Sequence, residues 1–341
     1  MTYSIASVFM INIAILVTNR CQASSIYTII DMLLAANYAN GKLLGKSYEV
    51  FSYDLIGLKK QQKAYNGLDI GPLTNISDIE RPDIVIIPGI AESVLSPSSF
   101  ELFLRHYQCW LTKLQQWHNQ GTLIASTCSG NLLVAAANLS RGRPLTCHWI
   151  SQQTVEELFP DEQFFTDKIL IDHGDLISVG GAAAVSNFVI YLIEREVNRE
   201  LALMTGKLML VEQDLSPQSS FALFQPNKRH NDEVVKSLQI WMEGNFQKST
   251  NIAELATKWN ISERQLARRF KKSTGDTPGN YVQKLRIEFV KRTLECSHET
   301  ANAIIWQAGY EDLSSFRRLF KRKTGLTMNE YRQRFGLRHA N

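Results

Sequence analysis

The sequence of 341 residues has few cysteines and no long apolar run, and both absences restrict what the protein can be. Its five cysteines are odd in number and scattered, with no CxxC pair and no His/Cys cluster at metal-ligand spacing. A disulfide framework and a structural zinc site are therefore not expected. The apolar stretch 5–17 is shorter than the about 18 residues that a membrane-spanning helix needs, and no basic segment precedes it. We interpret its second half as a buried strand, with a signal peptide as the alternative, and expect a protein of the reducing cytoplasm with no metal, cofactor or membrane partner.

The charge is almost balanced overall but unevenly distributed along the chain. Residues 232–341 contain 20 Lys+Arg and 12 Asp+Glu, whereas residues 1–231 contain 17 and 21. The composition of 44% hydrophobic and 21% charged residues is that of a globular protein and excludes wholesale disorder, collagen and coiled coil. A slightly acidic body with a basic C-terminal third indicates a sensing or enzymatic domain joined to a nucleic-acid binder.

In the first two thirds of the chain, short apolar runs alternate with helical patterns. We expect strands at 10–17, 49–53, 83–87, 122–126, 168–171 and 176–179, and helices at 24–38, 98–119 and 131–139. This alternation predicts a flavodoxin-like, three-layer α/β domain with a mainly parallel sheet.

One strand-to-helix junction in this domain has the layout of a catalytic or ligand-binding site. Cys128 follows the strand at 122–126 and is itself followed by Gly130, which is the layout of a nucleophile elbow. N–H groups at the start of the next helix would favour a thiolate or a bound anion there. His148 could reach the same pocket. The alternatives are that Cys128 is a small buried cysteine at a tight turn and that His148 has a structural role in its loop.

The motifs 87–89 (Ile-Pro-Gly), 125–130 (Ala-Ser-Thr-Cys-Ser-Gly) and 148–149 (His-Trp) resemble a known domain. They are similar to the class I glutamine amidotransferase-like (PfpI-like) domain, in the version found in GlxA-type transcriptional regulators, over residues 10–200. The resemblance implies a catalytic acid near the first helix, where this chain has Ser25, and a histidine directly after the nucleophile, where it has Ser129. We therefore expect a non-catalytic ligand pocket that contains Cys128, Ser25 and His148.

The basic third contains an internal repeat with an offset of 50 residues, which aligns Phe270 with Phe320 and Tyr281 with Tyr331. Each copy begins with a helix-turn-helix pattern, at about 250–271 and 300–321. Asn260 and Gly309 are the turn residues, because a left-handed backbone favours Asn and Gly. The residues opposite the buried face of each second helix are candidates for contacts with DNA. We expect base contacts from Arg264, Arg268, Ser314 and Arg318, and phosphate contacts from Arg269, Lys271, Lys272, Arg317, Lys321 and Arg322.

Residues 232–336 resemble the AraC/XylS-type DNA-binding domain, through the motifs at 255–270, 274–286 and 309–320. The resemblance implies seven helices, with a central helix at about 278–295, and RNA polymerase as a partner. Two positions depart from the pattern, because Ile305 replaces a small alanine and Met328 replaces a proline.

These observations predict a sensor domain at 1–211, a linker at 212–231 and a DNA-binding domain at 232–341. We expect a bacterial, cytoplasmic regulator that acts on the nucleoid as an activator and forms a homodimer. Its partners would be double-stranded DNA and a small effector such as a nitrogenous metabolite. Two alternatives are a hydratase- or amidase-like enzyme with Cys128 as nucleophile fused to a DNA-binding module, and an architectural DNA binder with an inert N-terminal scaffold.

Overall fold

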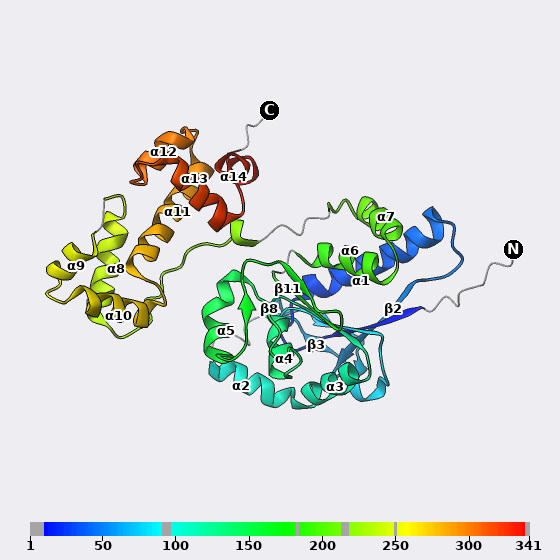
Figure 1. The fold of residues 1–341 in the computed structure, drawn as a ribbon. Helices are drawn as coiled ribbons and strands as arrows, with labels where there is room; N and C mark the ends of the chain where they lie inside the picture. Colours follow the sequence, from blue (N-terminus) through cyan, green and yellow to red (C-terminus); the bar gives the residue numbers. More distant parts are fainter. Residues whose placement is uncertain (1–9, 91–96, 182–183, 213–217, 249–250, 338–341) are drawn as a thin grey trace. The chain divides into compact units, whose positions relative to one another are not determined.

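The computed structural model describes residues 10–90, 97–181, 184–212, 218–248 and 251–337 (Figure 1). The chain forms two compact units, Met1–Gln218 and Ser219–Asn341. The division lies inside the segment 212–231 that we expected to be a linker. Its residues 213–217 are outside the described ranges, and its residues 219–231 belong to the C-terminal unit.

The N-terminal unit is built on a seven-stranded sheet with the order β10-β11-β7-β6-β1-β2-β5. Its strands are β1 (Ile11–Leu16), β2 (Phe51–Gly57), β5 (Thr74–Asn75), β6 (Ile84–Ile87), β7 (Leu123–Thr127), β10 (Leu170–Asp172) and β11 (Leu176–Val179). All neighbours pair in parallel except β10 and β11. Two small pairs, β3 (Gln62–Lys63) with β4 (Asp69–Ile70) and β8 (Leu145–Thr146) with β9 (Phe164–Phe165), lie outside this sheet. The prediction of a flavodoxin-like domain with a mostly parallel sheet is confirmed.

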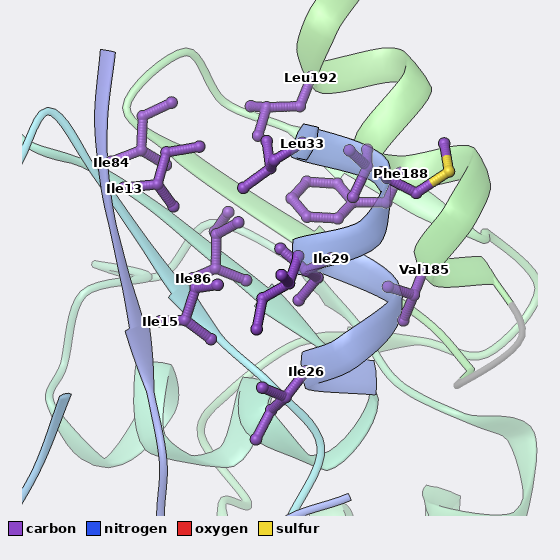
Figure 2. Close-up of a cluster of buried hydrophobic side chains, with 14 of the residues drawn as sticks. Ile13, Ile15, Ile26, Ile29, Leu33, Ile84, Ile86, Val185, Phe188 and Leu192 are labelled. Atoms are coloured by element: carbon purple, nitrogen blue, oxygen red, sulfur yellow. The ribbon is translucent and has the colours of Figure 1, made fainter. Parts of the chain in front are cut away.

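Helices cover both faces of the sheet, because its central strands are apolar on both sides. On one face, Ile13 and Ile15 of β1 pack with Ile29 and Phe188, as Figure 2 shows. The helices on this face are α1 (Ala23–Tyr38), α6 (Val185–Glu196) and α7 (Arg199–Met209). The opposite face is covered by α2 (Pro97–His106), α3 (Gln108–Asn119), α4 (Asn131–Ala136) and α5 (Gln152–Leu158). Within the described ranges, no helix is both long and apolar enough to cross a membrane.

The single helix that we expected at 98–119 is wrong, because the structure divides it into α2 and α3 at Tyr107. The backbone there leaves helical geometry, with φ −105° and ψ 21°. The Tyr107 hydroxyl accepts a hydrogen bond of 2.6 Å from the backbone N–H of Asn19, and its ring packs edge-on against Trp110 at 5.0 Å. The contact with Asn19, in the loop that follows β1, and the packing against Trp110 of α3 hold the tyrosine inside the core, which the periodicity of one helix does not reveal.

The C-terminal unit contains seven helices in the described residues. They are α8 (Glu233–Asn245), α9 (Ile252–Lys258), α10 (Glu263–Thr274), α11 (Pro278–Cys296), α12 (Ala301–Gln307), α13 (Leu313–Thr324) and α14 (Met328–Phe335). The long helix α11 contributes Tyr281 and Val282 to one hydrophobic core and Val290 and Leu294 to a second core. Each core therefore belongs to one helix-turn-helix unit, and α11 joins the two (Figure 1).

The two halves of this unit repeat each other in detail. The rings of Phe270 and Tyr281 meet edge-on at 5.3 Å, and those of Phe320 and Tyr331 do so at 5.5 Å. The second helix of each helix-turn-helix unit, α10 and α13 (the recognition helices), ends at a left-handed glycine, with φ +79° at position 275 and +78° at position 325. In the turns before the recognition helices, Asn260 and Gly309 have φ of +53° and +82°, as expected. The substituted Ile305 and Met328 are buried in the second core.

Candidate ligand site and nucleic-acid interface

The elbow at Cys128 lies at the carboxyl end of β7. Cys128 has φ of +52°, in the left-handed region that a non-glycine residue seldom adopts. A short 3-10 turn, Cys128–Gly130, then leads into α4. A side chain at position 130 would overlap the carbonyl oxygen of Ile87 and lie 2.8 Å from that of Pro88. Glycine at this position therefore lets the elbow rest directly on the end of β6.

Gly89 brings the start of α1 close to the elbow. A β-carbon at position 89 would lie 3.1 Å from Gln22 Oε1 and 3.4 Å from Cys128 Cβ. The buried Ser25 donates a hydrogen bond of 3.2 Å to the same Gln22 oxygen. Ser25 therefore reaches the surroundings of Cys128 through Gln22, a residue that sequence reasoning missed because nothing in the motif marks it.

Burial is the main influence on the Cys128 thiol and raises its pKa above the ordinary value. Hydrogen bonds from the backbone of Ser129, from its side chain and from the backbone of Gly181 act in the opposite direction but are weaker. The N–H group at the helix start therefore acts in the direction that we expected, toward the thiolate, but burial has the larger effect on the pKa. Because none of these groups is charged, they offset only part of the cost of desolvating a thiolate.

His148 stands at the edge of the same site. An added β-carbon on Gly181 would lie 3.6 Å from its Cδ2 atom, and burial lowers the pKa of the imidazole. Its Nδ1 accepts a hydrogen bond of 3.2 Å from the backbone N–H of Ile150. The neutral ring then carries its proton on Nε2, so the nitrogen that remains available is a donor rather than a base. The strand-to-helix glycines at 180–181 are the sequence signal that could have identified this wall of the site.

The recognition helices α10 and α13 present basic outer faces. Their apolar sides, with Leu266, Phe270, Phe316 and Phe320, are buried in the two cores. The expected DNA contacts that are solvent-exposed are Arg264, Arg268, Lys271, Lys272, Ser314, Arg317, Arg318, Lys321 and Arg322. Beside α13, a hollow of about 290 Å³ is lined by Arg317, Arg318 and Lys321 together with the start of α14.

Arg269, which we expected to contact a DNA phosphate, forms an ion pair within the protein. Its Nε and Nη2 donate hydrogen bonds of 2.9 and 2.7 Å to the two carboxylate oxygens of Asp232. Asp232 also caps α8, where it accepts a hydrogen bond from the N–H of Val235. Arg269 therefore ties the recognition helix α10 to α8, and its guanidinium is already occupied by a carboxylate.

The fold and these sites define a flavodoxin-like α/β domain with a cysteine elbow, followed by a helical domain with two helix-turn-helix units. Residues 12–195 match the DJ-1/PfpI family, and residues 255–334 match a helix-turn-helix domain family. The first match covers more than half of the chain, which therefore belongs to the DJ-1/PfpI family. Its helix-turn-helix domain is of the AraC type.

Two regulators of Pseudomonas aeruginosa are similar over most of their length. The HTH-type transcriptional regulator GbdR of strain UCBPP-PA14 is 25% identical over 329 residues, which are 94% of this chain and 84% of GbdR. The HTH-type transcriptional regulator CdhR of strain PAO1 is 24% identical over 262 residues, covering 76% of this chain and 74% of CdhR. Among solved structures, a candidate transcriptional regulator from Vibrio parahaemolyticus has a similar fold, with a TM-score of 0.50 and 17% identity. The match covers 59% of this chain and 100% of the Vibrio chain.

Proposed function

We propose that this protein is a DNA-binding transcriptional regulator whose DJ-1/PfpI domain binds a small effector without transforming it. The observation that carries the proposal is the duplicated helix-turn-helix geometry, in which α10 and α13 pack in two cores that the single helix α11 joins. Two such helices suit successive major-groove faces, about 34 Å apart along one side of the duplex. The names of GbdR and CdhR support the same role.

The exposed residues of α10 and α13 divide into base and phosphate contacts. Arg264, Arg268, Ser314 and Arg318 lie on the faces opposite the cores and are assigned to base edges. The neighbouring Lys271, Lys272, Arg317, Lys321 and Arg322 are assigned to phosphates. Arg269 is left out of this set because Asp232 already engages its guanidinium.

The environment of Cys128 supports binding rather than catalysis. Nucleophilic catalysis by cysteine needs a thiolate, and here burial raises the thiol pKa while the nearby His148 uses Nδ1 as an acceptor for a backbone N–H. Ser25 stands where related enzymes have their acid, and its hydroxyl is engaged by Gln22. A small nitrogenous metabolite with hydrogen-bonding groups fits a site whose described polar groups are amide, hydroxyl, thiol and imidazole.

Two measurements on the full chain test this function. Footprinting on a duplex enriched from a random library should show two protected major grooves on one face of the DNA. A thermal-shift screen with amino acids, betaines and polyamines should identify a compound that raises the unfolding temperature by mass action. Failure to enrich any duplex would refute the regulator.

Activation through RNA polymerase and a homodimeric state are further parts of the proposal and follow from the AraC resemblance. A reporter gene behind the enriched site tests the first, because activation requires the chain to increase transcription. The molar mass of the chain in solution tests the second.

The enzyme remains a second candidate because of the backbone at Cys128. A left-handed cysteine at a strand end, with the N–H groups of Ser129 and Gly181 on its sulfur, is typical of nucleophiles held under strain. Cys128→Ser distinguishes the two functions. A sensor keeps effector-dependent transcription in this variant, whereas an enzyme whose product is the signal loses it. Cys128→Trp fills the site and should abolish the response in either case.

A further inference from the structure

Gln218, the last residue of the N-terminal unit, is anchored by its side chain and its backbone. Its Nε2 donates hydrogen bonds of 2.8 Å to the carbonyl oxygen of Cys147 and 2.9 Å to that of Lys168. Its own N–H donates to the carbonyl oxygen of Asp167 at 3.0 Å. The residue is only 4% exposed, and a side chain at Gly180 would lie 2.5 Å from its amide nitrogen. Glycine at position 180 therefore makes room for this anchor.

The anchor of Gln218 adjoins the candidate effector site on two sides. Cys147, whose carbonyl it binds, is directly followed by His148. Gly180, against which it packs, is directly followed by Gly181, whose backbone hydrogen-bonds to the Cys128 thiol. A molecule that moves His148 therefore acts on the peptide unit that holds Gln218, and one that moves Gly181 acts on the glycine against which Gln218 packs.

The next residues of the chain are fixed to the DNA-binding unit. The ring of Phe221 meets Phe335 of α14 edge-on at 5.1 Å. The carbonyl oxygen of Ala222 accepts a hydrogen bond from Nζ of Lys291, a lysine that is 2% exposed in the C-terminal half of α11.

The same segment also reaches the other half of that unit. The ring of Phe224 packs edge-on against Tyr281 at 5.2 Å, and Tyr281 belongs to the core of the first helix-turn-helix unit. Phe335, the partner of Phe221, packs against the core of the second. Residues 221–224 therefore contact both halves along α11.

We infer that Gln218 is the residue through which the site at Cys128 is coupled to the DNA-binding unit. Only Ser219 and Ser220 separate it from Phe221, so at most about 11 Å of chain joins the two anchors. Such a short connection transmits a displacement of one anchor to the other. The inference rests on the proposed function and adds its route of regulation. Because coupling between two sites is reciprocal, DNA binding must also alter the surroundings of Cys128.

The test measures the alkylation rate of Cys128 by iodoacetamide in the full chain, with and without a saturating duplex enriched from a random library. Peptide mass spectrometry resolves each cysteine, and the exposed Cys109 of the same unit reports any general change in reactivity. In the wild type we expect DNA to change the Cys128 rate by about fivefold or more, because the rate follows the population of the state in which the thiol is accessible, and a coupling at the lower end of the allosteric range shifts that population by about this factor.

Two variants should remove this DNA dependence. Gln218→Ala deletes the anchor, and an insertion of Gly-Ser-Gly between Gln218 and Ser219 keeps both anchors but slackens their connection. Gln115→Ala is the matched control, because Gln115 makes a similar hydrogen bond of 2.8 Å to the carbonyl oxygen of Ala137 elsewhere in the unit. It should retain the wild-type ratio.

The results separate this inference from the proposed function. The coupling is rejected if the wild type binds DNA without a change in the Cys128 rate, or if both variants keep the change. Either result is compatible with the proposed function as a regulator. A wild-type chain that binds no enriched duplex overturns the regulator and the coupling together. Loss of the change in Gln115→Ala as well as in Gln218→Ala shows general destabilisation and also contradicts a specific role for Gln218.

Discussion

Gly309, the turn residue of the second helix-turn-helix unit, lies directly against the backbone of Gln247, which follows α8. A β-carbon at position 309 would overlap the Gln247 carbonyl oxygen, and the glycine also has φ of +82°. Alanine is disfavoured at position 309 for two reasons, the left-handed backbone and the overlap with the Gln247 carbonyl oxygen. We expect Gly309→Ala to destabilise the unit by at least about 2 kcal/mol in a denaturant titration.

Gly279→Ala is the control for that prediction. Gly279 lies in the first turn of α11 with open space around it. Alanine there should be neutral or stabilising by up to about 1 kcal/mol, because glycine is the poorer helix former. Equal losses of stability in both variants would mean that Gly309 has no special role.

The ion pair between Asp232 and Arg269 should make the stability of the C-terminal unit depend on pH. Hydrogen bonds from Arg269 lower the pKa of Asp232 below its ordinary value. A carboxyl with a depressed pKa in the folded state contributes stability above its unfolded pKa of about 3.9, and this contribution is lost as the pH falls through the folded pKa. Arg269→Gln should therefore lower the unfolding temperature at pH 7, and the difference from wild type should shrink below about pH 4. A difference that does not depend on pH would contradict the role of the pair.

The exposed arginines of α10 should affect specificity, whereas its lysines should affect affinity for any DNA. Arg264→Ala and Arg268→Ala should each cost about 1–3 kcal/mol on the enriched duplex and relax the preference at one base pair. Lys272→Ala should weaken binding to all sequences alike and reduce the salt slope by about one unit. Titrations of specific and random duplexes at several salt concentrations provide these values. If Arg268→Ala weakens random DNA as much as the enriched duplex, the residue does not contact a base.

The raised pKa of Cys128 should make this residue slow to react near neutral pH. We expect iodoacetamide to modify it more slowly at pH 7 than a free thiol, and the rate to keep increasing above the ordinary thiol pKa of 9.0. Mild peroxide at pH 7 should leave it reduced, because the thiolate is the reactive form. Rapid oxidation under these conditions would show that a redox-sensing thiolate exists at this site.

Residues 219–231 should stabilise the DNA-binding unit even without the N-terminal unit. A fragment of residues 219–341 keeps the contacts of Phe221 and Phe224, whereas one of residues 232–341 lacks them. We expect the longer fragment to unfold at a temperature at least ~5 °C higher, since about 1 kcal/mol shifts a domain of this size by several degrees. Both fragments should protect about two helical turns of DNA. Equal unfolding temperatures would show that the segment adds nothing to the unit.

The sequence by itself determined the features that depend on neighbours along the chain. The alternation of apolar runs with helical patterns predicts the parallel sheet, because strands buried on both faces must be apolar throughout. The turn residues Asn260 and Gly309 mark left-handed positions, and the repeat at 50 residues reveals two equivalent units. The placement of Cys128 and Gly130 likewise identifies the elbow, because its geometry is local.

Only the tertiary structure decided the features that depend on residues distant in sequence. Tyr107 interrupts a helix because of a contact with Asn19, and Arg269 is occupied by Asp232, 37 residues away. Burial by the surrounding fold sets the direction of the Cys128 pKa and outweighs the N–H groups that its local motif provides. The anchor of Gln218 depends on carbonyl groups 50 and 71 residues earlier, and no pattern of neighbouring residues encodes such a meeting.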